Sequence, residues 1–288
     1  MKTLARTLFL LFLCLGLIHG AVTYESSLQT IRFWFEQLVP SLLFFMVTVR
    51  MILPLSLPLM PLKALNLSKE AVNWVICCLL AGSPACVALI DEAVQKEQLS
   101  VSQGQRLAYC CQNVTPGYIL ISCGQLLLNS TAKGLKIYGC LLLGNLVLLA
   151  LTRSVPIASI PVKQDDAPFI IRLNRAIADS GRCLFMMGGV LLVVSVSVAL
   201  LSCHVSKSMI LPVHCLAEFS TGIRMLMMRD LDPSFKECLI CFILGFGSLS
   251  VHLQCLSVSS HLKLDPVVLI VTRLAQGLIA AGFYLLML

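Results

Sequence analysis

Charged residues are scarce in this sequence: Asp, Glu, Lys and Arg make up 12% of its 288 residues, whereas 58% are hydrophobic. Soluble globular proteins carry roughly 25% charged residues, so this chain lacks the polar groups needed to cover its surface in water. A hydrocarbon solvent removes that requirement, because apolar side chains can then face lipid. The scarcity of charge therefore indicates an integral membrane protein.

The alternating segments of about ten residues that are typical of membrane β-barrels are also missing. The apolar runs are instead continuous and rich in leucine, as in Leu141–Leu151 and Leu184–Leu201. Backbone groups in lipid must be paired within the protein, which leaves helices once a barrel is excluded. We predict an all-α, multi-pass protein of the cell membrane, with the lipid bilayer as its surroundings. Residues 1–26, with Lys2 and Arg6 before the apolar run Leu8–Ile18, form a transmembrane helix or signal anchor in this prediction.

Motifs of known catalytic or metal chemistry are absent as well. The chain has no H-E-x-x-H, no G-x-S-x-G elbow and no Walker loop. Its 14 cysteines are scattered through apolar runs, where cysteine acts as a small hydrophobe. Cys238 and Cys241 form a C-x-x-C without a second ligand pair. We predict no enzyme, no cofactor or metal, and no nucleic-acid partner, because the net charge of +7 is diffuse and suits cytoplasmic loops.

What the sequence does have is apolar runs broken by glycine and proline. A polar linker, 153–182, divides the chain into 27–152 and 183–288. The first part contains an apolar helix at Val39–Leu59, runs broken at Gly82–Pro84 and at Asn113–Gly117, and a helix at Leu135–Leu151. The second contains, in the same order, a helix at Cys183–Leu201, breaks at Glu218–Gly222 and Gly245–Ser250, and a helix at Pro266–Leu288.

This order predicts two repeats, each made of a helix, a re-entrant hairpin, a broken helix and a second helix. Each repeat would cross the membrane an odd number of times, so the two repeats would be inverted relative to one another, as in many transporters. With the N-terminus inside, this arrangement places more Lys and Arg on the inside than on the outside, in the sense of the positive-inside rule.

The breaks predict a binding site. A break strands backbone groups at a cost of several kcal/mol each, so it persists only where it is packed in protein or lines a wet cavity. The alternative is that these small residues merely help helices to pack, but breaks in matched order favour a site. Its predicted substrate-binding residues are Ser83, Asn113, Thr115, Glu218, Thr221, Ser250, His252 and Gln254.

Ionisable residues within the apolar runs are the other candidates, because a charge at the bilayer centre costs about 2.5–3.5 kcal/mol on insertion scales. Glu218 is a candidate for ion coupling or proton relay. His252 is either a substrate contact or a neutral histidine hydrogen-bonded between helices. We expect Arg50 and Arg273 to snorkel from helix ends. Asp91 and Glu92 are expected in a solvated loop, within a charged connection that ends at Arg106.

Several of these segments resemble the YlbJ family of sporulation integral membrane proteins, within the nucleoside-recognition (Gate) superfamily. The similarity covers the chain from about Gln29 and is most specific at GFGSLSVHLQ, residues 245–254. It is supported by PSLLFF at 40–45, CQNVTP at 111–116 and EFSTG at 218–222. The first hairpin departs from the family pattern S-G-Y-P-x-G-A-K at Ala81, Ser83, Cys86 and Ala88, so that the family lysine is missing.

The resemblance implies inverted repeats similar to those of concentrative nucleoside transporters and a role in spore formation, with dipicolinate as the family's solute. We expect a transporter or permease of a small, anionic, dipicolinate-like metabolite, with a possible coupling ion and a possible homo-oligomer. In a spore former, the expected location is the outer forespore membrane. The alternatives are a non-transporting membrane protein of spore assembly and a nucleoside-transporter-like protein.

Overall fold

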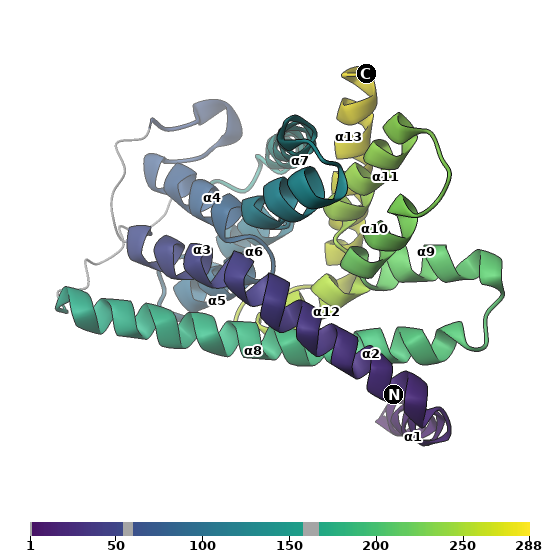
Figure 1. The fold of residues 1–288 in the computed structure, drawn as a ribbon. Coiled ribbons are helices and arrows are strands. Elements are labelled where there is room, and N and C mark those ends of the chain that lie inside the picture. Colours follow the sequence, from purple (N-terminus) through teal and green to yellow (C-terminus); the bar gives the residue numbers. More distant parts are fainter. Residues whose placement is uncertain (1, 54–59, 158–166) are drawn as a thin grey trace.

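A computed structural model describes residues 2–53, 60–157 and 167–288 (Figure 1). The last residues of the predicted helix Val39–Leu59 and residues 158–166 of the predicted linker lie outside this part of the chain. The described residues form helices, together with isolated β-bridges from Leu67 to Leu62 and Ile157. The all-α prediction is confirmed.

Helices long and apolar enough to cross a bilayer support the multi-pass prediction. They are Thr131–Leu151, Phe169–Ser202, Pro233–Ser257 and Pro266–Leu286. A further pair, Phe9–Ile18 and Gly20–Leu38, meets the same test as one span bent by 102°. The chain is therefore a multi-pass membrane protein.

The N-terminal region forms α1 (Lys2–Ile18) and α2 (Gly20–Phe33), and α2 continues through a π-helical turn, Trp34–Leu38, into α3 (Val39–Ile52). The wide turn follows from Pro40, which has no amide hydrogen for the ordinary helical bond. Val39 N instead donates to Trp34 O. The helix predicted from Val39 thus begins at Gly20, and the predicted boundary at residue 26 falls inside α2.

The rest of the first part contains a helical hairpin, a broken helix and a long helix. The hairpin is α4 (Lys69–Ala81) and α5 (Ala85–Gln95), joined at Gly82–Pro84. The broken helix is α6 (Val101–Cys110) and the π-helical segment Tyr118–Leu127, and it is followed by α7 (Thr131–Leu151). Ser100 and Gln103 close a capping box at the start of α6, so much of the predicted charged connection is helical.

The second part has the same order of elements. It contains α8 (Phe169–Ser202), the hairpin α9 (Lys207–Ala217) and α10 (Phe219–Met227), the broken helix α11 (Pro233–Phe246) and α12 (Ser248–Ser257), and α13 (Pro266–Leu286). α8 begins at Phe169 rather than at Cys183, inside the predicted linker, and it carries Arg172, Arg175 and Asp179 in its first turns. All predicted breaks separate helices in the structure.

Two long helical layers frame the breaks. The helix α2–α3 crosses α8, while α13 lies beside α7 and α11 (Figure 1). Trp34 fixes the first crossing, since its Nε1 donates to Leu184 O at 3.1 Å. Gly245 and Gly277 fix the second: a Cβ on Gly245 would lie 2.6 Å from the Cα of Gly277. The breaks are held between these layers.

Polar side chains link the elements at the two ends of this bundle. At one end, Lys133 pairs with Glu237 at 2.6 Å, and Lys136 donates to Met287 O. At the other end, Gln105 donates to Leu262 O at 2.9 Å. The inverted relation of the two repeats stays a prediction.

We expect Gly277→Val to destabilise the protein by about 1–3 kcal/mol, the usual cost of overpacking, because a Cβ there would lie 2.7 Å from Phe242 O. Gly282→Val, in the same helix, is the control, since a Cβ at Gly282 has nothing within 4 Å. Thermal unfolding of both variants in detergent measures the difference. Equal midpoints would contradict the close α11–α13 packing.

Candidate functional site

The break of the first hairpin contacts the break of the first broken helix. Ser83 N donates to Asn113 O at 2.7 Å, and Ser83 Oγ donates to Gln112 Oε1 at 3.4 Å. Gly82, at φ +70°, touches the second break so closely that a Cβ would lie 2.5 Å from Thr115 Cγ2. Only glycine fits there, because both the backbone conformation and the space exclude a side chain.

Arg273 of α13 joins the first broken helix to the second. Its guanidinium donates to Gln112 O, to Phe246 O at 3.4 Å and to Leu244 O at 3.5 Å. The residue is 1% exposed, so the expectation that it snorkels from a helix end is wrong. Backbone carbonyls left free by both breaks hold it inside, and the negative end of the α11 dipole favours its charge.

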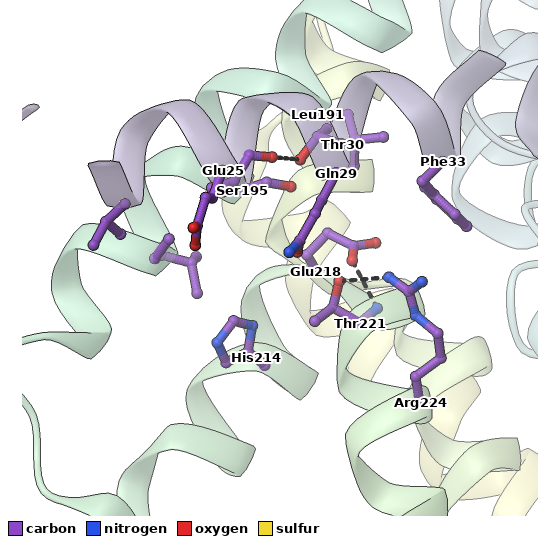
Figure 2. Close-up of a pocket in the computed structure, with 14 residues that line it drawn as sticks. Glu25, Gln29, Thr30, Phe33, Leu191, Ser195, His214, Glu218, Thr221 and Arg224 are labelled. Carbon is purple, nitrogen blue, oxygen red and sulfur yellow. Dashed lines mark hydrogen bonds between the residues drawn. The ribbon is translucent and has the colours of Figure 1, made fainter. Parts of the chain in front are cut away.

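Glu218 forms the break of the second hairpin and caps α10. Its carboxylate accepts from Ser220 N at 3.0 Å, from Thr221 N at 2.8 Å and from Ser220 Oγ at 2.8 Å. Thr221 Oγ1 in turn accepts from Arg224 at 3.3 Å (Figure 2). Glu218 is 3% exposed. The N-terminus of α10, which could otherwise bind a solute anion, thus holds the chain's own carboxylate.

All four breaks contribute to one small cavity of about 40 Å³, which we call the break cavity. Its polar lining is Ser83, Thr115, Glu218, Ser250 and Gln254. Apolar side chains complete the wall, among them Phe33, Leu42, Tyr118, Leu191 and Phe219. The rings of Tyr118 and Phe219 meet edge-to-face at 5.3 Å and so connect the second break with the third. This volume suits a few waters rather than an aromatic solute.

The remaining predicted site residues lie outside this cavity. Asn113 is fully buried and donates to Asn145 Oδ1 at 2.8 Å. Thr221 faces a separate cleft beside Glu218. His252 is 2% exposed, shares a hydrogen bond of 2.9 Å with Phe246 O and packs edge-on against the Phe246 ring. This geometry matches the predicted alternative of a histidine that is hydrogen-bonded between helices.

Two amide side chains that sequence reasoning missed support the site from behind. Asn145 of α7 donates to Cys110 O at 2.6 Å. Gln276 of α13 donates to Leu141 O at 2.9 Å and to Asn145 Oδ1 at 3.1 Å. The available signal was an amide beside a glycine, Gly144 or Gly277, in an otherwise apolar helix. Together with Asn113 they tie the second break to both long helices.

Of the two carboxylates expected in a solvated loop, Asp91 is buried, whereas the side chain of Glu92 is 35% exposed. Asp91 accepts from His261 N at 2.7 Å and Leu262 N at 2.8 Å, which fixes the loop before α13. Arg106 is 4% exposed and donates to Leu65 O and Val155 O, both at 2.7 Å. These side chains take the place of water as hydrogen-bond partners of the loop carbonyls and amides. In the described ranges, no group of three His, Cys, Asp or Glu side chains is placed to hold a metal ion.

Two larger hollows lie at opposite ends of α8. The Glu218 cleft, about 240 Å³, is lined by Glu25, Ser195, His214, Glu218 and Arg224 among others (Figure 2). The Arg50 pocket, about 220 Å³, is lined by Arg50, Trp74, Glu92, Lys96, Arg172, Arg175, Ala176 and Asp179 among others. At about 1.5 Å per residue, Ala176 and Ser195 are separated by roughly 28 Å along α8, close to the roughly 30 Å of a bilayer core.

The fold and the site define the chain as a multi-pass, all-helical membrane protein with a small polar cavity between broken helices. Among curated proteins it is similar to the sporulation integral membrane protein YlbJ of Bacillus subtilis (strain 168). The two are 23% identical over 337 aligned positions, which cover 99% of this chain and 83% of that protein. This similarity supports the resemblance to the YlbJ family, as a distant one. No family model matches it, and no solved structure does.

We expect Arg273→Met to lower stability by several kcal/mol, because each buried carbonyl left unpaired costs about 1–3 kcal/mol. The control is Arg229→Met, the same loss of charge at an exposed position. Protein yield in the membrane and the unfolding midpoint in detergent report the effect. If Arg273→Met matched the control in both, the guanidinium would not be what holds the two broken helices together.

Proposed function

We propose that this protein is a transporter or permease that moves a small polar metabolite across a membrane. The observation that carries the proposal is the meeting of all four helix breaks at one cavity, with the Glu218 cleft and the Arg50 pocket at opposite ends of α8. Broken helices that meet near the bilayer midplane are typical of solute sites in secondary transporters. The cavity measures about 40 Å³, too little for such a metabolite, so solute entry requires a hairpin to move and widen it.

The break cavity recognises its solute through Ser83, Thr115, Ser250 and Gln254, which offer hydroxyl and amide groups to a polar molecule. Glu218 is the carboxylate on its wall, and no basic side chain among the described residues lines it. A solute anion therefore enters with a compensating proton or cation, and Glu218 is the group that takes it. This extends the role of ion coupling predicted for Glu218.

A dipicolinate-like dicarboxylate is the candidate solute, and sporulation is the candidate process. Both come from the similarity to YlbJ, which is named as a sporulation integral membrane protein. A neutral, nucleoside-like solute suits the uncharged part of the cavity wall equally well, so both solutes belong in the test. The rival function is a non-transporting protein of spore assembly, for which the cavity would be packing only.

Purified protein in liposomes with entrapped terbium tests transport, because dipicolinate forms a luminescent complex with this ion. We expect Glu218→Gln and Ser250→Ala to slow dipicolinate entry about tenfold or more, the loss expected when one charge-assisted hydrogen bond is removed. Glu36→Gln, which removes an exposed carboxylate from the π-helical turn, is expected to transport like the unchanged protein. A radiolabelled nucleoside is measured in parallel.

The outcomes separate the functions. Entry of dipicolinate or nucleoside that depends on Glu218 supports transport and selects the solute. If neither solute enters and all variants support spore formation equally, the transporter proposal fails and the assembly function takes its place.

A further inference from the structure

The Arg50 pocket contains a buried cation whose bonding is incomplete. Arg50 of α3 pairs with Glu92 of α5 through both terminal nitrogens, at 3.0 Å from Nη1 to Oε2 and 2.9 Å from Nη2 to Oε1. The side chain of Arg50 is 9% exposed and that of Glu92 is 35% exposed. Arg50 Nε is buried and has no partner among the described residues. The guanidinium therefore has unused capacity, whereas its carboxylate partner is accessible to solvent.

The walls of this pocket carry an excess of positive charge. Lys96 of α5 and Arg172 and Arg175 of α8 line it together with Arg50, against the carboxylates of Glu92 and Asp179. The pocket measures about 220 Å³, which is large enough for a phosphate or a small dicarboxylate. Arginine forks match such groups with paired hydrogen bonds, so the lining suits an oxyanion.

The Arg50–Glu92 pair also links the first hairpin to α3. Glu92 and Asp91 are neighbours on the second arm of the first hairpin, and both carboxylates accept hydrogen bonds. Asp91 accepts from the backbone amides of His261 and Leu262, which do not line the pocket. Among the described residues, the Glu92 carboxylate accepts only from the guanidinium of Arg50, which does line it, and another carboxylate or phosphate can accept from that guanidinium in the same way.

We propose that the Arg50 pocket is a binding site for a small oxyanion, and that the anion competes with Glu92 for Arg50 and so releases the first hairpin from α3. The ligand class is a phosphate or carboxylate group, whether free in solution or on a lipid headgroup. The binding step is independent of the proposed transport function, whereas its role as a latch on the hairpin rests on that function.

Trp74 lines the same pocket and makes a reporter. The chain has two tryptophans, so the response is assigned to Trp74 by its loss in Trp74→Phe, which leaves the Trp34 contact with Leu184 in place. The full-length protein, in phosphatidylcholine nanodiscs, is titrated with inorganic phosphate and with malonate. Both anions are transparent at the excitation wavelength. We expect a saturable change in Trp74 emission.

The variants distinguish competition between the anion and Glu92 from a purely structural role of the pocket residues. Glu92→Gln removes the competing carboxylate and is expected to bind the anions about tenfold more tightly, while Arg172→Gln is expected to bind about tenfold more weakly. Glu97→Gln and Lys69→Gln, at exposed positions outside the pocket, make the same charge changes and are expected to leave the affinity unchanged. Arg172→Gln keeps the Arg50–Glu92 pair, so it tests the site even if Glu92→Gln does not fold.

Nanodiscs containing phosphatidylglycerol separate the two sources of the anionic group. A shift in Trp74 emission there without added anion, with weaker malonate binding, assigns the pocket to a lipid headgroup. A response confined to soluble anions assigns it to a free solute. No response to phosphate, malonate or phosphatidylglycerol overturns the site, and equal affinity in Glu92→Gln overturns the competition. Anion binding in a protein that moves no solute would leave this inference standing and remove the proposed function.

Discussion

The structure depends on one constraint: a helix broken within a membrane must find partners for the backbone groups that it frees. Arg273 meets this need for both broken helices, since its guanidinium donates hydrogen bonds to the carbonyls of Gln112, Leu244 and Phe246. A buried cation without a carboxylate partner would ordinarily be costly. Here the freed carbonyls and the buried guanidinium satisfy one another, so neither could be removed alone.

The same constraint explains why the breaks lie together. Ser83 N donates to the carbonyl of Asn113. The side chains of Asn113, Asn145 and Gln276 form a hydrogen-bonded chain of amides from the second break to α7 and α13. Each break is thus satisfied in part by another break or by a helix behind it. A cavity assembled in this way has walls whose positions are coupled, because buried polar networks tolerate few alternative arrangements.

The sequence predicted the helical class, the order of elements and the positions of the breaks, because glycine and proline act locally on the backbone. Glu218 was also predictable, as an acid inside an apolar run. The burial of Arg273 and Asp91 was not. A charged side chain that hydrogen-bonds to backbone groups distant in sequence lies in the same local sequence pattern as one that reaches solvent. His252 has the geometry of one of its two predicted alternatives, because its partner Phe246 is close in sequence and shares a hydrogen bond with the ring without a solute.

The barriers on the two sides of the break cavity differ in thickness. The Glu218 cleft and the cavity share Glu218, Phe33 and Leu191 as walls, so a single layer of side chains separates them. The Arg50 pocket shares no described lining residue with the cavity, and the first hairpin between them is held by Glu92 and by the neighbouring carboxylate. In the proposed transport function, opening toward Glu218 would require movement of one short hairpin arm. Opening toward Arg50 would require a charged pair to exchange partners first, so the proposed anion site would control access on that side.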